Sequence, residues 1–229
     1  MGRRAERVRP ALALRVSEVF TSLQGEGPTA GTSSVFVRLQ GCSVGCAWCD
    51  TKYSWPASGG RAVALERLLA DVAAAAPENV VVTGGEPLEH PGFEPLVRGL
   101  RRLRRRIEVE TAGTRVPPPV AVDQWNVSLK LAHSGVPQER RLQPTAIARF
   151  RRLPAWFKFV VGTEADVEEV RALQARYRLP AARILLMPLG LERAAQQALM
   201  PQVMAWCRRE GYRFSPRLHI LAWGPRRGV

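Results

Sequence analysis

Three cysteines lie close together in the chain, Cys42, Cys46 and Cys49, within Gly-Cys-Ser-Val-Gly-Cys-Ala-Trp-Cys. Three thiolates on one short loop can bind three irons of a 4Fe-4S cluster and leave the fourth iron open to another ligand. A metal site closed by protein ligands is structural or transfers electrons, whereas an open position admits a substrate. The spacing therefore predicts a catalytic iron-sulfur site.

The remaining cysteine, Cys207, lies far from this loop in a segment with a helical pattern, 203–209, and we expect it to be buried by packing rather than to bind metal. A zinc ribbon requires two Cys-x-x-Cys pairs, and only one is present. No signal peptide is visible at the Arg-rich N-terminus, so we expect a cytoplasmic protein whose cysteines stay reduced.

The net charge of +14 would ordinarily favour a nucleic-acid partner. Only three of the 34 basic residues are lysines, which indicates a compositional bias toward arginine rather than a binding surface. The densest basic run is 98–106. Apolar residues recur at helical spacing along and just before it, at Leu96, Leu100 and Leu103, which favours a helix with a solvated basic face over an RNA-binding patch. No stretch is apolar for long enough to cross a membrane.

The elements that must position the cysteines alternate between short β-branched runs and amphipathic helical runs, a pattern typical of a mostly parallel sheet covered by helices. Helical stripes fall at 65–72 and 167–177, and Pro201 is expected to begin a further helix. A tail, 1–13, precedes a single domain, 14–229. The predicted strands are 14–20, 34–39, 80–83, 107–110, 125–129, 156–161, 184–187 and 218–221.

Polar or glycine-rich residues follow the first five strands, and carboxyl ends of parallel strands meet at one face, so we expect these segments to converge on one rim. Gly84 and Gly85 either let the backbone approach a ligand or form a simple tight turn. Glu86 is held extended before Pro87, so its carboxylate can face a ligand's ammonium group. The five segments are 21–27, the cysteine loop, 83–87, 110–114, and Ser128 with Lys130.

The cysteine spacing, with an aromatic residue before the last cysteine, and Gly-Gly-Glu-Pro at 84–87 resemble the radical S-adenosylmethionine superfamily. Within it, the chain resembles the 7-carboxy-7-deazaguanine synthases of queuosine and 7-deazapurine biosynthesis from about Phe20 to the C-terminus. The resemblance implies an α/β fold, an incomplete (β/α) barrel or partial TIM barrel with the active site at the C-terminal ends of its strands, assembled as a homodimer. The motifs that carry it are Ser22–Gly27, Arg38, Asp50–Thr51, Glu110–Thr114 and Arg217–Gly224.

The same resemblance implies a lyase that converts 6-carboxy-5,6,7,8-tetrahydropterin to 7-carboxy-7-deazaguanine and ammonia by radical ring contraction. Its cofactors would be a 4Fe-4S cluster, S-adenosylmethionine and Mg²⁺. Its partners would be the small pterin substrate and an electron donor such as a flavodoxin or ferredoxin, with no membrane or nucleic acid. We expect no catalytic side chain, because the cofactor radical carries the chemistry.

Site residues follow from the resemblance position by position. The cluster would be held by Cys42, Cys46 and Cys49, and S-adenosylmethionine would contact Trp48, Cys49, Asp50, Gly85, Glu86, Thr111, Ser128 and Lys130. The pterin would contact Leu23, Gln24, Gly25, Glu26, Arg38, Thr83, His219 and the terminal carboxylate of Val229. The planar guanidinium of Arg38 suits the substrate's carboxylate, and Glu26 can accept hydrogen bonds from the pterin edge. The chain departs from the family pattern at Leu129 and Leu189.

Several alternatives stay open. Thr51 is expected to give its hydroxyl oxygen to Mg²⁺, with Asp50 as a second candidate, although Thr51 could instead cap a helix. His219, expected on the last strand, could be a core histidine. A glycyl-radical activase of the same superfamily would share the cluster but not the Gln-Gly-Glu-Gly loop with Arg38. A basic, metal-stabilised RNA-binding module would need aromatic stacking platforms that the sequence does not offer.

Overall fold

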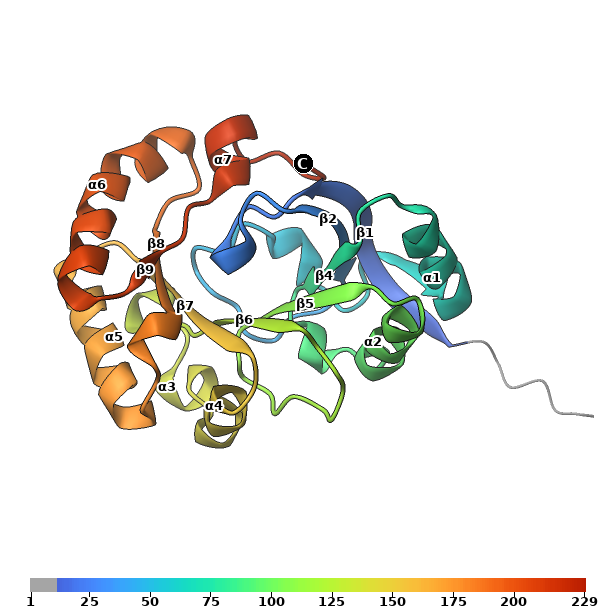
Figure 1. The fold of residues 1–229 in the computed structure, drawn as a ribbon, viewed down its shortest axis with the longest axis horizontal. Helices are drawn as coiled ribbons and strands as arrows, with labels where there is room; N and C mark the ends of the chain where they lie inside the picture. Colours follow the sequence, from blue (N-terminus) through green and yellow to red (C-terminus); the bar gives the residue numbers. More distant parts are fainter. Residues whose placement is uncertain (1–11) are drawn as a thin grey trace, which may run out of the picture.

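The structure is a computed structural model that describes residues 12–229, so nearly all of the predicted tail, 1–13, lies outside the described residues. Nine strands form one sheet in the order β3-β1-β2-β4-β5-β6-β7-β8-β9. Figure 1 shows this sheet curving around the centre of the molecule without closing. The strands are β1 (Ala13–Leu23), β2 (Ser33–Leu39), β3 (Arg61–Ala64), β4 (Asn79–Gly84), β5 (Arg106–Thr111), β6 (Gln124–Ser128), β7 (Ala155–Val161), β8 (Ile184–Pro188) and β9 (Arg213–Phe214).

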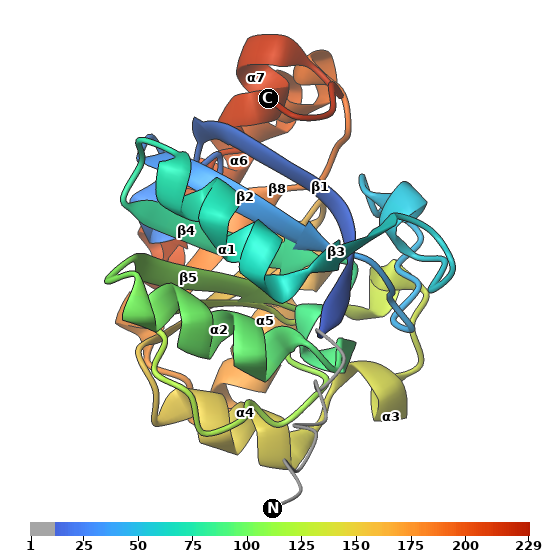
Figure 2. The ribbon, with the colours of Figure 1, turned by 90° about the vertical axis from the view of Figure 1, so that its right-hand side faces the viewer.

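Helices cover the outer face of the curved sheet, and Figure 2 shows α1 and α2 lying side by side there. The predicted stripes at 65–72 and 167–177 are confirmed as α1 and α5. No helix within residues 12–229 has the length and apolar content of a membrane span. The helices are α1 (Leu65–Ala74), α2 (Phe93–Arg102), α3 (Gln138–Arg141), α4 (Pro144–Arg151), α5 (Glu164–Tyr177), α6 (Arg193–Glu210) and α7 (Leu218–Trp223).

Strands β2 and β4 to β9 run parallel to one another, and β9 is only two residues long. Six full-length parallel strands therefore form the incomplete barrel that the resemblance implied. Val80, Val81 and Val82 are fully buried, which is typical of a parallel strand covered on both faces. Seven of the eight predicted strands are confirmed.

The basic run is confirmed as mainly helical, because α2 buries Leu96 and Leu100 and leaves Arg98 and Arg101 exposed. The helix ends at Arg102, and Arg106 already belongs to β5. Arg98 pairs with Glu94 on the same helix, so the run is a solvated face of the barrel.

Two predictions of local structure are wrong. Residues 218–221 form helix α7 rather than a strand, because the amides of Ile220 and Leu221 both bond to the carbonyl of Arg217 and turn the chain. Pro201 lies inside α6 instead of beginning a helix. Pro201 and Gln197 are both exposed, so water can bind the carbonyl that the missing proline amide leaves unpaired.

The direction of β1 also differs from the expected one. β1 is antiparallel to β2, and Leu23 at its carboxyl end pairs with Ser33 at the amino end of β2. The segment 21–27 therefore reaches the barrel interior from the end opposite to the cysteine loop. Only the other four predicted segments follow parallel strands, so the expectation that all five share one rim is wrong.

Candidate functional site

All but one of the predicted site residues line a single cavity of about 460 Å³ inside the barrel. This volume lies in the range of small-molecule sites. Glu86 is the exception. The predicted residues that line the cavity are Leu23, Gln24, Gly25, Glu26, Arg38, Cys42, Cys46, Trp48, Cys49, Asp50, Thr51, Thr83, Gly85, Thr111, Ser128, Lys130, His219 and Val229.

The cysteine loop follows β2 and is anchored on both sides by backbone hydrogen bonds. The amide of Cys42 donates to the carbonyl of Trp55 (3.1 Å), and the amide of Ala47 donates to that of Ser134 (2.9 Å). Its sulfurs lie in an apolar surrounding that includes Val44 and Val136. Burial raises the pKa of Cys42 to about 11 and also raises the pKa of Cys46, so metal binding must displace protons from these thiols.

The spacing of these sulfurs bears on which metal they fit. Three sulfurs on one tetrahedral zinc ion lie about 3.8 Å apart. Within residues 12–229, the one group of three metal-binding side chains whose ligand atoms all lie within 4.8 Å is Glu26, Asp50 and His219. The three cysteine sulfurs are not grouped as closely as the ligands of a single ion would be.

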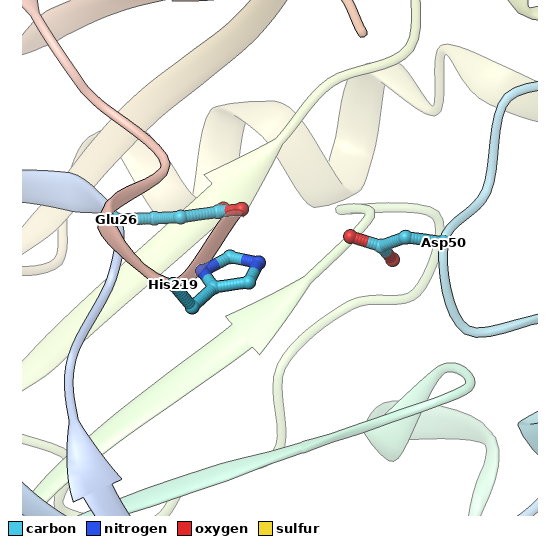
Figure 3. A group of neighbouring side chains, drawn as sticks. All are labelled: Glu26, Asp50 and His219. Carbon is cyan, nitrogen blue, oxygen red and sulfur yellow. The ribbon is translucent and has the colours of Figure 1, made fainter. Parts of the chain in front are cut away.

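The group formed by Glu26, Asp50 and His219 comes from three distant segments, and Figure 3 shows the three side chains pointing toward a common space. Its two carboxylates are already paired with cations. Arg217 donates to Glu26 (Nε to Oε1, 3.1 Å) and also to Asp50, and Lys158 donates to the other oxygen of Glu26. A metal ion here would have to displace a buried cation, so the arrangement is an ion network rather than a metal site.

Burial and the neighbouring charges together determine the protonation states of this network. Burial alone would raise the pKa of Glu26, but Lys158 and Arg217 outweigh it and hold that pKa below its ordinary value. Burial would lower the pKa of Lys158, yet the charge of Glu26 outweighs it and raises that pKa. Burial lowers the pKa of His219, which keeps its imidazole neutral near pH 7. This network, which we call the cavity floor, thus presents the charges of Glu26 and Lys158 beside the neutral ring of His219.

Lys158 and Arg217 were missed by the sequence reasoning. Lys158 lies on β7, and it is 6% exposed, so a lysine within an otherwise apolar strand was the available signal. Arg217 belongs to a motif that carried the resemblance, but no role was assigned to it. Besides Glu26 and Asp50, Arg217 donates to the carbonyl of Gly190 (2.8 Å), so it joins three loops.

The two glycines at the end of β4 serve packing against the cysteine loop. A Cβ at Gly85 would lie 2.1 Å from the carbonyl oxygen of Gly41 and 2.8 Å from the Cβ of Cys42. The amide of Glu86 donates to that same Gly41 oxygen (2.9 Å), and the amide of Gly85 donates to Leu39 (3.2 Å). The glycines therefore let β4 support the loop directly, a role that neither sequence alternative included.

Glu86 is 2% exposed, and its carboxylate is used within the protein. It accepts hydrogen bonds from the hydroxyl of Thr111 (2.7 Å) and from the amides of Ala112 (2.7 Å) and Leu88 (3.1 Å). Burial raises its pKa, an effect that the three donors oppose. The carboxylate thereby ties the end of β4 to the end of β5, beside the cavity rather than in its lining.

Trp48 and Lys130 form one wall beside the cysteines. The Nζ of Lys130 lies 5.0 Å from the centroid of the Trp48 ring and donates to the hydroxyl of Ser128 (2.8 Å). The indole Nε1 of Trp48 is buried and has no hydrogen-bond partner among residues 12–229. An unpaired buried N–H is costly, so this wall fits a ligand that supplies an acceptor.

Thr51 precedes a short 3-10 helix, Lys52–Ser54, but its hydroxyl makes no capping hydrogen bond there. The hydroxyl instead lies 3.5 Å from the sulfur of Cys49. The capping alternative is therefore not realised by the side chain, and the oxygen remains available to a cation at the cavity wall.

Arg38 and His219 also line the cavity. Arg38 donates through Nε to Glu18 (2.7 Å), and its two Nη atoms make no hydrogen bond to residues 12–229. His219 lies on α7, not on a strand, and a Cβ at Gly25 would be 2.3 Å from its Nδ1. Gly25 therefore makes room for the histidine, and the amide of Leu218 fixes the contact by donating to the Gly25 carbonyl (2.9 Å).

Known proteins resemble this chain in sequence and in fold. The radical SAM superfamily model matches residues 36–128. A 7-carboxy-7-deazaguanine synthase from Pyrobaculum aerophilum is 42% identical and covers 94% of this chain and 97% of its own length. One from Hyperthermus butylicus is 40% identical and covers 98% and 100%. The crystal structure of QueE from Escherichia coli aligns with a TM-score of 0.73 at 29% identity, over 90% of this chain and 95% of that one.

Proposed function

The chain belongs to the 7-carboxy-7-deazaguanine synthase family within the radical S-adenosylmethionine superfamily, and we infer that its cavity converts 6-carboxy-5,6,7,8-tetrahydropterin to 7-carboxy-7-deazaguanine and ammonia. The enzyme is a carbon-nitrogen lyase that uses a 4Fe-4S cluster and S-adenosylmethionine. The observation that carries this function is that one cavity is lined both by the three thiols and by the partly unpaired guanidinium of Arg38.

When bound, the cluster and S-adenosylmethionine would supply the radical chemistry that removes a hydrogen atom from the pterin. The chain's own residues hold the reactants and exclude water. We assign Cys42, Cys46 and Cys49 to the cluster. Glu86 does not line the cavity, so it would act indirectly, through its hydrogen bond to the amide of Ala112. S-adenosylmethionine is assigned to Trp48, Cys49, Asp50, Gly85, Glu86, Thr111, Ser128 and Lys130.

The pterin is assigned to the part of the cavity lined by Arg38, Glu26 and His219. The two Nη atoms of Arg38 suit a bidentate bond to the substrate's carboxylate. Glu26 stays ionised beside Lys158 and can accept hydrogen bonds from the pterin edge, while the neutral ring of His219 can donate or accept one. Further contacts are assigned to Leu23, Gln24, Gly25, Thr83 and the terminal carboxylate of Val229.

We place Mg²⁺ at the hydroxyl of Thr51, where the substrate and water would supply most of the other oxygen ligands. Asp50 is the weaker candidate, because its carboxylate already pairs with Arg217. We also propose a cytoplasmic homodimer that receives its electron from a flavodoxin or ferredoxin. Light scattering of the purified protein would measure the oligomeric state.

Deuterium transfer tests the proposed function. The protein is reconstituted anaerobically with iron and sulfide and is given S-adenosylmethionine, a chemical reductant and the pterin labelled with deuterium at C6. We expect deuterium in the recovered S-adenosylmethionine, because the cosubstrate returns hydrogen to the product radical and is regenerated. Product without deuterium in S-adenosylmethionine would reject this scheme, and consumption of S-adenosylmethionine without any pterin product would favour a glycyl-radical activase.

A further inference from the structure

Glu18 is the centre of a polar cluster in the cavity wall next to Arg38. Its Oε1 accepts hydrogen bonds from the Nε of Arg38 (2.7 Å) and from the hydroxyl of Tyr53 (2.6 Å). Its Oε2 faces the Nη2 of Arg227 at 3.7 Å. One carboxylate on β1 therefore joins β2, the segment after the cysteine loop, and the C-terminal segment.

Arg227 also packs on Tyr53. Its guanidinium lies 3.7 Å from the centroid of the Tyr53 ring, which is a short cation–π distance. The Tyr53 hydroxyl in turn donates to Glu18. Arg227 thus contacts Glu18 and Tyr53, which are joined to each other by a hydrogen bond.

The C-terminal segment, residues 225–229, lines the cavity along its whole length. Among the hydrogen bonds and ion pairs of residues 12–229, the pair between Arg227 and Glu18 is the one that connects this segment to any residue before Gly224. A chain end of this length loses its position unless it is tied down. The ion pair of Arg227 with Glu18 is therefore the contact through which the position of Val229 can be held.

We propose that Glu18 is a positioning residue that sets Arg38 and the C-terminal segment in one arrangement, with Arg227 as the latch that holds the segment against the cavity. This inference rests on the proposed function, because Arg38 and the Val229 carboxylate are assigned there to the pterin. Because Glu18 binds the Nε of Arg38, both Nη atoms can bind one ligand. Through Arg227, the Glu18 carboxylate also holds Val229, the second proposed pterin contact, in place relative to Arg38.

A double-mutant cycle tests the coupling. We expect Arg227→Ala and Glu18→Gln each to raise the KM for the pterin about tenfold, and the double variant to resemble Glu18→Gln alone rather than to reach about a hundredfold. The Kd of S-adenosylmethionine and the iron content should stay unchanged. Arg227→Lys should recover much of the lost affinity, because a lysine can keep the ion pair and the contact with the ring. Arg67→Ala is the matched control, since Arg67 is exposed on α1 and pairs only with Asp71.

Hydrogen exchange of the metal-free protein gives a readout that does not depend on turnover. Backbone amides of residues 226–229 should exchange faster in Arg227→Ala and in Glu18→Gln, and at the wild-type rate in Arg67→Ala. Tyr53→Phe keeps the ring and removes one donor to Glu18, so it serves as the second variant if Glu18→Gln does not fold, with an intermediate rise in exchange expected.

Exchange at the wild-type rate in Arg227→Ala, or single effects on KM that multiply in the double variant, would overturn the proposal. The proposed function fails in a different way, because wild-type protein would then form no product from the pterin. In that case the hydrogen-exchange experiment would still report on the latch.

Discussion

Gly85→Ala tests whether β4 supports the cysteine loop by direct contact. The new Cβ would lie 2.1 Å from the Gly41 oxygen, whereas real Cβ atoms essentially never approach within 3.0 Å, so the loop must move. Overpacking of this kind costs about 1–3 kcal/mol, and weakening the bond from the Glu86 amide to Gly41 adds about 1 kcal/mol. We expect a loss of about 2–4 kcal/mol in the free energy of unfolding, which lowers Tm by about 5–15 °C in a chain of this size.

Two measurements check this prediction: thermal unfolding of the metal-free protein, and iron per chain after anaerobic reconstitution, which should fall as Cys42 is displaced. Gly162→Ala is the control, because its added Cβ would meet the flexible end of Leu189 at 3.2 Å and its three nearest neighbours are all side-chain atoms. A Gly85→Ala protein that unfolds at the wild-type temperature and binds the full complement of iron would refute the reasoning.

Three further predictions concern single side chains. Cys42→Ser should abolish the visible absorbance of the reconstituted cluster, whereas Cys207→Ser, which alters a buried residue of α6, should leave the iron content unchanged. Glu26→Gln should cost about 3–5 kcal/mol at pH 7, because it leaves Lys158 without its buried partner. The pKa of Glu26 is depressed in the folded state, so its contribution to stability is present at neutral pH and is lost on acidification. In urea unfolding, the difference in free energy of unfolding between wild type and Glu26→Gln should therefore shrink as the pH falls from about 5 to about 3. Thr51→Val should raise the Mg²⁺ concentration for half-maximal turnover at least about tenfold with Tm unchanged, and an unaltered Mg²⁺ titration would place the ion elsewhere.

The parallel part of the barrel could be predicted from sequence because its strands are buried on both faces and read as continuous apolar runs, as at Val80–Val82. The direction of β1 could not, because its residues read the same whether the neighbouring strand is parallel or antiparallel. The conformation of 218–221 was also beyond local reasoning. Its apolar residues fit a strand equally well, and its docking through Leu218 onto Gly25 is a contact between distant segments.

The candidate site divides in the same way. Cys46 could be placed at a metal site from the spacing of the cysteines, which is a local property of the sequence, and Arg38 could be placed at the cavity through the family resemblance. The partners that set their charge and orientation, Glu18, Lys158 and Arg217, come from strands and loops that are far apart in the chain. Pairing between such residues depends on the folded barrel, so no spacing in the sequence could reveal it.

Glu26 and Arg217 lie 191 positions apart, so the floor of the cavity is made by the two ends of the chain. During synthesis, all three cysteines leave the ribosome while that floor is still missing its second half. A nascent chain therefore has its thiols accessible to iron delivery long before α7 can dock on Gly25. Docking of α7 on Gly25 is the contact that completes the pocket for the pterin.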